Sequence, residues 1–138
     1  MTEPGLPAVV LRTTPYGESD LVVQLFVRGR GRTGAFARAA RASKRRFAGG
    51  LEPFSLLDVE LGDRRGRDLA ELRGATLVDA HLALRQDLHR LAHAGYATEL
   101  CRELLRDDEP NDALFDLIAA FYAHLAGAGA RSLVLRAF

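Results

Sequence analysis

The pattern of apolar and polar positions changes near residue 80. Before that point, apolar residues form short runs rich in β-branched and aromatic side chains, with turn-forming clusters between them. Such runs are typical of β-strands. After it, Leu, Ala and aromatic residues recur at helical spacing, which is typical of amphipathic helices. The pattern therefore predicts an α+β protein in which strands come first and helices follow.

Five segments of the first part are predicted to be strands: Ala8–Thr14, Leu21–Arg28, Thr33–Arg38, Phe54–Leu61 and Asp68–Val78. In the fourth segment Asp58 and Glu60 alternate with apolar residues, which indicates one polar and one buried face. The fifth segment is ambiguous: Leu69 and Leu72 fit a helix, but Gly74 and Thr76 favour a strand with a β-bulge. Gly29–Gly31 and Asp63–Arg67 are predicted hairpin turns. Five strands in this length of chain match a small closed OB-fold barrel.

Three apolar stripes in the second part predict helical segments: Leu82, Leu84, Leu88, Leu91 and Ala92; Tyr96, Leu100, Cys101, Leu104 and Leu105; and Leu114, Phe115, Leu117, Ile118, Phe121, Tyr122 and Leu125. The segment Asp108–Asp112 is predicted to end one helix and cap the next. A further segment, Arg131–Phe138, has no stop signal, so we expect either a fragment of a longer protein or a stripe that packs on a partner. We predict a barrel domain over 1–80 and an incomplete helical domain over 81–138.

Composition supports a folded, non-membrane protein. The 138 residues are 48% apolar and 27% charged, as in ordinary globular domains. No apolar run approaches the roughly 20 residues of a membrane-spanning helix, and the N-terminus lacks the pattern of a signal peptide. The single cysteine, Cys101, excludes an internal disulfide and is expected in the core. We expect a cytoplasmic location.

The charge distribution is more informative than the net charge of +1. Eight basic side chains and no acid lie between residues 28 and 46: Arg28, Arg30, Arg32, Arg38, Arg41, Lys44, Arg45 and Arg46. A cluster of this density favours a polyanionic partner, because each neutralised phosphate releases condensed counterions. Phe36 and Phe47 flank the cluster and Tyr16 precedes it, a combination found in single-strand grooves. A solvated basic loop, with the aromatic rings in the core, is the alternative.

Other candidate sites are weaker. Residues 29–34 match G-x-G-x-x-G, but a dinucleotide site needs a helix, a second parallel strand and a later acid. The nearest acid, Glu52, directly precedes a proline, so a hairpin turn is the favoured interpretation. His89 and His93 have the spacing of two metal ligands on a helix, but no third ligand is evident. We therefore predict no catalytic site, no enzyme activity and no cofactor.

Three ordered segments resemble the N-terminal part of the RecO family of bacterial DNA repair proteins. Val9–Leu11, with the turn Tyr16–Asp20, resembles the family's first strand and turn. Gly31–Arg41 resembles its third strand, and Ser43–Leu57 its basic loop and the strand that follows. Ala39 stands where the family usually has glycine. The helical part resembles the family in pattern only, and family members are considerably longer.

The resemblance implies an N-terminal OB-fold followed by a helical domain. It implies binding of single- and double-stranded DNA, annealing of complementary strands, and contacts with RecR and with the acidic tail of single-strand-binding protein, which together help load RecA. The family's DNA contacts map onto Arg38, Arg41, Lys44, Arg45 and Arg46, and secondarily onto Arg28, Arg30 and Arg32. The candidates for tail binding are Arg131 and Arg136.

Two other functions stay open. In one, the chain is a protein-interaction adaptor whose basic loop and helices bind an acidic peptide. In the other, it is a small enzyme that holds a nucleotide at the Gly-rich turn. DNA binding predicts steep salt dependence without base preference. The adaptor predicts peptide binding that survives removal of the loop charges, and the enzyme predicts saturable mononucleotide binding.

Overall fold

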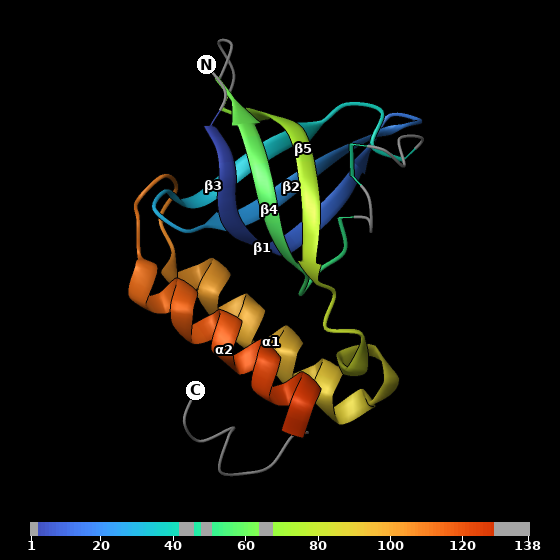
Figure 1. The fold of residues 1–138 in the computed structure, drawn as a ribbon, viewed down its shortest axis with the longest axis vertical. Coiled ribbons are helices and arrows are strands. Elements are labelled where there is room, and N and C mark those ends of the chain that lie inside the picture. The colour runs from blue at the N-terminus through green and yellow to red at the C-terminus, as the bar shows by residue number, and fades with distance from the viewer. Residues whose placement is uncertain (1–2, 42–45, 48–50, 64–67, 129–138) are drawn as a thin grey trace.

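A computed structural model describes residues 3–41, 46–47, 51–63 and 68–128 (Figure 1). It contains β1 (Glu3–Tyr16), β2 (Asp20–Val27), β3 (Gly31–Ala37), β4 (Leu56–Gly62), β5 (Ala70–Asp79), a short 3₁₀ helix η1 (Leu82–Gln86), α1 (Leu88–Leu104) and α2 (Asp112–Ala128). All five predicted strands are present, and helices follow them. The predicted α+β class is confirmed.

The five strands form a closed barrel in the order β1-β2-β3-β5-β4. Neighbouring strands are antiparallel except β3 and β5, which pair in parallel at Ala35 and Phe36. The first half of β1 pairs with β4 and the second half with β2, so this long strand closes the barrel. This is the predicted OB-fold arrangement. A register shift between Glu60 and Leu61, opposite Gly74, confirms the bulge.

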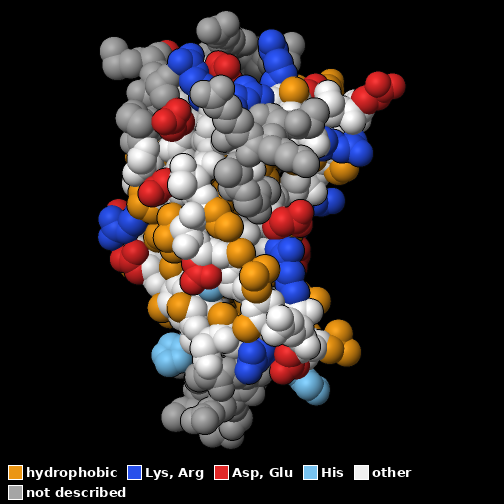
Figure 2. All heavy atoms as spheres, turned by 45° about the vertical axis from the view of Figure 1, so that its right-hand side comes forward, with side chains coloured by type: hydrophobic (Ala, Val, Ile, Leu, Met, Phe, Trp, Pro, Cys, Tyr) orange, Lys and Arg blue, Asp and Glu red, His pale blue; other side chains and the backbone are white. Residues whose placement is uncertain are grey.

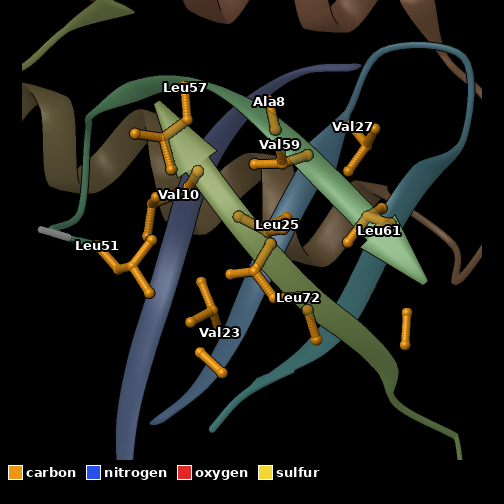
Figure 3. Packing of buried hydrophobic residues seen from close by; sticks show 14 of the residues in the cluster. Ala8, Val10, Val23, Leu25, Val27, Leu51, Leu57, Val59, Leu61 and Leu72 are labelled. Atoms are coloured by element: carbon orange, nitrogen blue, oxygen red, sulfur yellow. The ribbon is translucent and has the colours of Figure 1, made fainter. Parts of the chain in front are cut away.

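The barrel interior is filled by aliphatic side chains from all five strands (Figure 3). Val59 and Leu61 point inward, whereas Asp58 and Glu60 are exposed, as the alternation predicts. The labelled valines and leucines of this core are Val10, Val23, Leu25, Val27, Leu51, Leu57, Val59, Leu61 and Leu72. The barrel therefore has a hydrophobic core of its own.

A second core joins the barrel to the helices, which lie across one end of it (Figure 1). Val9 and Leu11 of β1 and Phe26 of β2 point away from the barrel interior and are buried against the helices. The Phe26 ring meets Phe115 of α2 edge to face, with centroids 5.4 Å apart. Because β1 is covered on both faces here, its sequence is a continuous apolar run rather than an alternating one.

The buried face of α1 differs from the prediction. In the first predicted stripe, Leu82 and Leu88 are 65% and 81% exposed, whereas Leu84 is buried as predicted. In the second, Tyr96 and Leu104 are exposed, whereas Cys101 and Leu105 are buried. Both stripes are therefore only partly correct. Asp87 caps α1 by accepting from the backbone of His89, at 2.9 Å, and Arg90, which starts the helix at Leu88. Small side chains let α1 approach its neighbours closely, and the buried face consists of Ala94, Ala97, Thr98 and Cys101.

The predicted burial of Cys101 is confirmed. The side chain is fully buried, and burial raises the pKa of its thiol to about 11. Nearby, Thr98 of α1 and Tyr122 of α2 share a buried hydrogen bond between their hydroxyl groups. Desolvation raises the pKa of the Tyr122 phenol. Both hydroxyls and the thiol therefore stay protonated and act as packing groups of the second core.

The passage from barrel to helices is fixed by His81. This buried residue has a left-handed backbone, with φ of 49°. Its Nδ1 lies 2.7 Å from the carbonyl oxygen of Phe54, and its ring lies 5.7 Å from that of Tyr122. The contacts link β5, the segment before β4, and α2.

Neither α1 nor α2, nor any other helix among the described residues, is long and apolar enough to cross a membrane.

Candidate nucleic-acid interface

The structure separates the predicted basic residues into two groups. Arg28, Arg30 and Arg32 lie at the β2–β3 turn, which we call the turn group. Arg38, Arg41 and Arg46 follow β3 and form the loop group. At about 3.3 Å per residue, the length of β3 places the two groups roughly 20 Å apart. Four other predicted residues lie outside the described part of the chain: Lys44, Arg45, Arg131 and Arg136.

Arg28 of the turn group is paired with two carboxylates of α2. Its Nε and Nη2 donate to the two carboxylate oxygens of Asp116, both at 3.1 Å, and its Nη1 lies 3.4 Å from Asp112. Hydrogen bonding to Asp116 raises the pKa of the Arg28 guanidinium, and the same contact lowers the pKa of Asp116. This two-pronged geometry is the one arginine prefers with a carboxylate. The charge of Arg28 is thus largely offset within the protein.

Arg32 is paired in a similar way with the connection between α1 and α2. Its Nε donates to Asp107 at 2.7 Å, and its Nη1 donates to the carbonyl oxygen of Arg102 at 2.6 Å. Arg102 in turn donates from Nε to Gln24 of β2 at 2.8 Å. The turn group therefore holds the helices against the barrel, a structural role that its position in a basic cluster does not reveal.

A hollow of about 500 Å³ lies on the outer surface of β2 and β3, beside this pairing. Three aspartate carboxylates border the hollow, and the one guanidinium beside them, that of Arg32, already pairs with Asp107. The lining residues are Val22, Val23, Gln24, Arg32, Gly34, Asp68, Leu69, Asp107 and Asp108. Excess negative charge disfavours phosphate, so this hollow is a poor place for a nucleic-acid backbone.

The loop group begins at the opposite end of β3, where it is held against the β1–β2 turn. The Arg41 amide donates to the carbonyl oxygen of Ser19 at 3.0 Å, and the Ala39 amide donates to the Asp20 carboxylate at 2.7 Å. These bonds fix the backbone while the side chains of Arg38 and Arg41 remain exposed. Two guanidinium groups are thereby presented to solvent from a fixed backbone.

Arg46 lies against β5 at the other side of the same loop. Its carbonyl oxygen accepts from the Ala75 amide at 2.9 Å, and its guanidinium carbon lies 4.9 Å from the Phe47 ring centroid. Arg46 also donates to the carbonyl oxygen of Arg38. Phe47 itself is buried in the barrel core. The loop group is therefore gathered at one end of the barrel.

Two aromatic rings meet at that end. Tyr16, the last residue of β1, is 61% exposed, and Phe36 near the end of β3 is half-buried. Their centroids are 5.7 Å apart and the rings are nearly perpendicular, at 81°. The sequence pattern did not pair them, although both precede the turns that the strand pattern places at one end of a barrel.

Figure 2 shows how charged side chains are distributed over one face of the molecule. Its upper, barrel half carries more Lys and Arg side chains than its lower, helical half. Acidic side chains are interspersed on both halves, and hydrophobic ones gather across the middle. The overall charge is nearly balanced, so an electrostatic site for a polyanion must be local.

The described residues support neither a dinucleotide site at residues 29–34 nor a metal site at His89 and His93. Residues 29–34 form a hairpin turn and a strand, as predicted, rather than the opening of a helix. His93 uses Nδ1 toward the carbonyl oxygen of His89, at 2.6 Å. Within the described ranges, no cluster of three or more His, Cys, Asp or Glu residues could hold a metal ion.

Comparison with known protein families shows which family the chain belongs to. Residues 1–81 match the family described as Recombination protein O N terminal, and residues 85–138 match Recombination protein O C terminal. The chain belongs to the recombination protein O family. The resemblance inferred from the strand, turn and basic-loop residues is confirmed, and the match extends through the helical part.

Several relatives named DNA repair protein RecO align with nearly the whole chain. The protein of Anaeromyxobacter dehalogenans strain 2CP-C is 54% identical over 133 residues, which are 96% of this chain and 52% of that protein. The Myxococcus xanthus protein is 47% identical over 131 residues, covering 95% and 53%. The Geobacter sulfurreducens protein is 46% identical over 123 residues, covering 89% and 50%. The chain spans about half the length of these relatives.

Proposed function

We propose that this RecO chain binds DNA through the loop-group end of its barrel. The observation that carries the proposal is the contrast between the two groups of arginines. Arg28 and Arg32 are paired with carboxylates, whereas Arg38 and Arg41 extend from a fixed backbone into solvent. Lys44 and Arg45, which follow Arg41 in the sequence and lie outside the described residues, are further proposed DNA contacts. Phosphates of single- or double-stranded DNA are the expected ligands.

The proposed activity needs no catalytic residue. Cations that neutralise phosphates on two strands lower the repulsion between those strands and so promote their annealing. We propose a non-enzymatic recombination mediator that anneals complementary strands and helps load RecA onto DNA coated with single-strand-binding protein. The proposed partners are RecR and the acidic tail of single-strand-binding protein, the latter near Arg131 and Arg136. A nucleoid location and a division into domains at residue 80 belong to the same proposal.

The test compares two double variants in labelled-DNA anisotropy at several salt concentrations. Arg38→Ala/Arg41→Ala is expected to weaken DNA binding about tenfold and to lower the salt slope by about 2, while thermal stability is unchanged. Arg28→Ala/Arg32→Ala removes the same charge from the turn group. It is expected to lower thermal stability and to alter the salt slope less. Unchanged DNA affinity in a folded Arg38→Ala/Arg41→Ala variant contradicts the proposal.

One observation favours the second candidate, a protein-interaction adaptor. Three large apolar side chains of α1, those of Leu88, Tyr96 and Leu104, are largely exposed. Exposed apolar side chains on a helix are one feature of protein-binding surfaces. Binding of an acidic peptide that is lost in Leu88→Ala/Leu104→Ala but retained in Arg38→Ala/Arg41→Ala would favour the adaptor.

A further inference from the structure

Among the described barrel residues, Tyr16 is the one largely exposed aromatic side chain. Its ring packs edge to face on Phe36, which lies on the outer surface of β3. The strand registers place Val22 between them, paired with Thr14 of β1 and with Phe36 of β3. The Tyr16 ring is therefore packed against Phe36 on the outer surface of the barrel, near Val22 of the intervening strand.

The start of the loop group lies beside the turn that follows Tyr16. The bonds from Arg41 to Ser19 and from Ala39 to Asp20 hold the start of the β3–β4 loop beside the turn that follows Tyr16. Arg41 also donates to the carbonyl oxygen of Gly17, at 3.5 Å, directly after Tyr16. The exposed Tyr16 ring is thus next in sequence to Gly17, the residue that Arg41 of the positively charged loop contacts. Cationic loops beside aromatic faces are the combination that binds unpaired nucleic acid.

Three acids lie at the same end and indicate which part of a nucleotide lies there. Glu18 is exposed in the β1–β2 turn, and Asp20 accepts from the Ala39 amide. Glu71, which is paired with Arg73 at 3.5 Å, is the register neighbour of Phe36 on β5. Their charge disfavours a phosphate directly over the rings. A neutral base is compatible with this position, whereas the phosphates are expected toward Arg38 and Arg41.

We propose that Tyr16, supported by Phe36, stacks on an unpaired base and so gives the DNA site a preference for single strands. The inference rests on the proposed DNA binding, because stacking adds to a contact that the arginines begin. Bases of a duplex already stack on one another, so the Tyr16 ring is available only to an unpaired base. The preference comes from the π face of the ring and is independent of base identity.

The test uses Tyr16→Ala with an oligonucleotide and its duplex, each titrated by anisotropy at fixed salt. Single-strand affinity is expected to fall about tenfold, while duplex affinity and the salt slope stay the same. Tyr16→Leu keeps apolar bulk against Phe36 but has no π face, and it is expected to lose as much. Tyr16→Phe is expected to bind like the parent. Tyr96→Ala is the matched control, because Tyr96 is 67% exposed but lies on α1.

A spectroscopic measurement reports stacking directly. The fluorescence of 2-aminopurine placed in the single strand is expected to be quenched by the parent protein and by Tyr16→Phe, but not by Tyr16→Leu. Equal losses for single strand and duplex, or no loss in Tyr16→Leu, overturn the stacking role and leave the proposed DNA binding standing. A folded parent protein that binds neither DNA form overturns both.

Discussion

At the residue scale, Ala39 holds a backbone conformation that favours glycine. Its backbone is left-handed, with φ of 54°. Its amide is held by Asp20, so the conformation is imposed by the junction between the β1–β2 turn and the loop group. A left-handed backbone costs a residue with a Cβ roughly 1–2 kcal/mol.

Ala39→Gly is therefore expected to stabilise the protein. The gain in the native state exceeds the extra chain entropy of glycine, which leaves a net increase of roughly 0.5–1 kcal/mol in the free energy of unfolding. Urea denaturation followed by circular dichroism measures it. Ala40→Gly is the matched control, because Ala40 has no left-handed backbone and packs against the barrel core. Stabilisation by both variants, or by neither, contradicts the explanation.

At the scale of elements, the β2–β3 turn is fitted closely to the α1–α2 connection. Gly31 has a positive φ of 84°, and a Cβ there would lie 2.1 Å from the carbonyl oxygen of Glu109. Gly29 has a similar φ of 87° but open space around it. The adjacent backbone is joined by a bond from the Asp108 amide to the Arg32 carbonyl oxygen, at 2.9 Å. The turn and the connection thus meet backbone to backbone.

The two glycines separate backbone strain from docking. Gly29→Ala is expected to cost about 1–2 kcal/mol, the price of the left-handed conformation alone. Gly31→Ala carries the same strain and also forces the α1–α2 connection away, so it is expected to cost at least about 2 kcal/mol more. Thermal melting of both variants measures the difference. Equal costs would show that the close approach of the two elements does not matter for stability.

At the scale of the whole molecule, the two cores share strands. Val10 of β1 lies in the barrel core, whereas its neighbours Val9 and Leu11 lie in the core with the helices. Phe26 likewise alternates with Leu25 and Val27 along β2. Loss of the helices would therefore expose apolar residues of β1 and β2, two strands of the barrel. The barrel and the helices are expected to stabilise each other.

One cooperative unfolding transition is the expected result. Phe26→Ala, which removes the ring against Phe115, is expected to shift that single transition and to lower stability by about 3–5 kcal/mol. Calorimetry measures both, with the calorimetric and van't Hoff enthalpies equal for a single transition. A variant with two transitions, of which only one is shifted, would show that the barrel folds independently of the helices.

The sequence alone determined the order and type of the elements, because both depend on local periodicity. Alternating residues predicted β4, Gly74 predicted the bulge in β5, and the segment around Pro110 predicted where one helix ends and the next begins. The ordered motifs of the first part also identified the family. These features are encoded by neighbouring residues, and distant contacts did not override them.

The tertiary structure decided which charges are available and which apolar faces are buried. Arg28 pairs with Asp116, which is 88 residues away in sequence, and Tyr16 of β1 packs on Phe36 of β3 across the intervening strand β2. The face of α1 that packs inward carries small residues, so hydrophobicity alone selected stripes that are only partly correct. Such pairings depend on strand register and on how the helices dock. No local pattern encodes them, because the interacting residues become neighbours only when the chain folds.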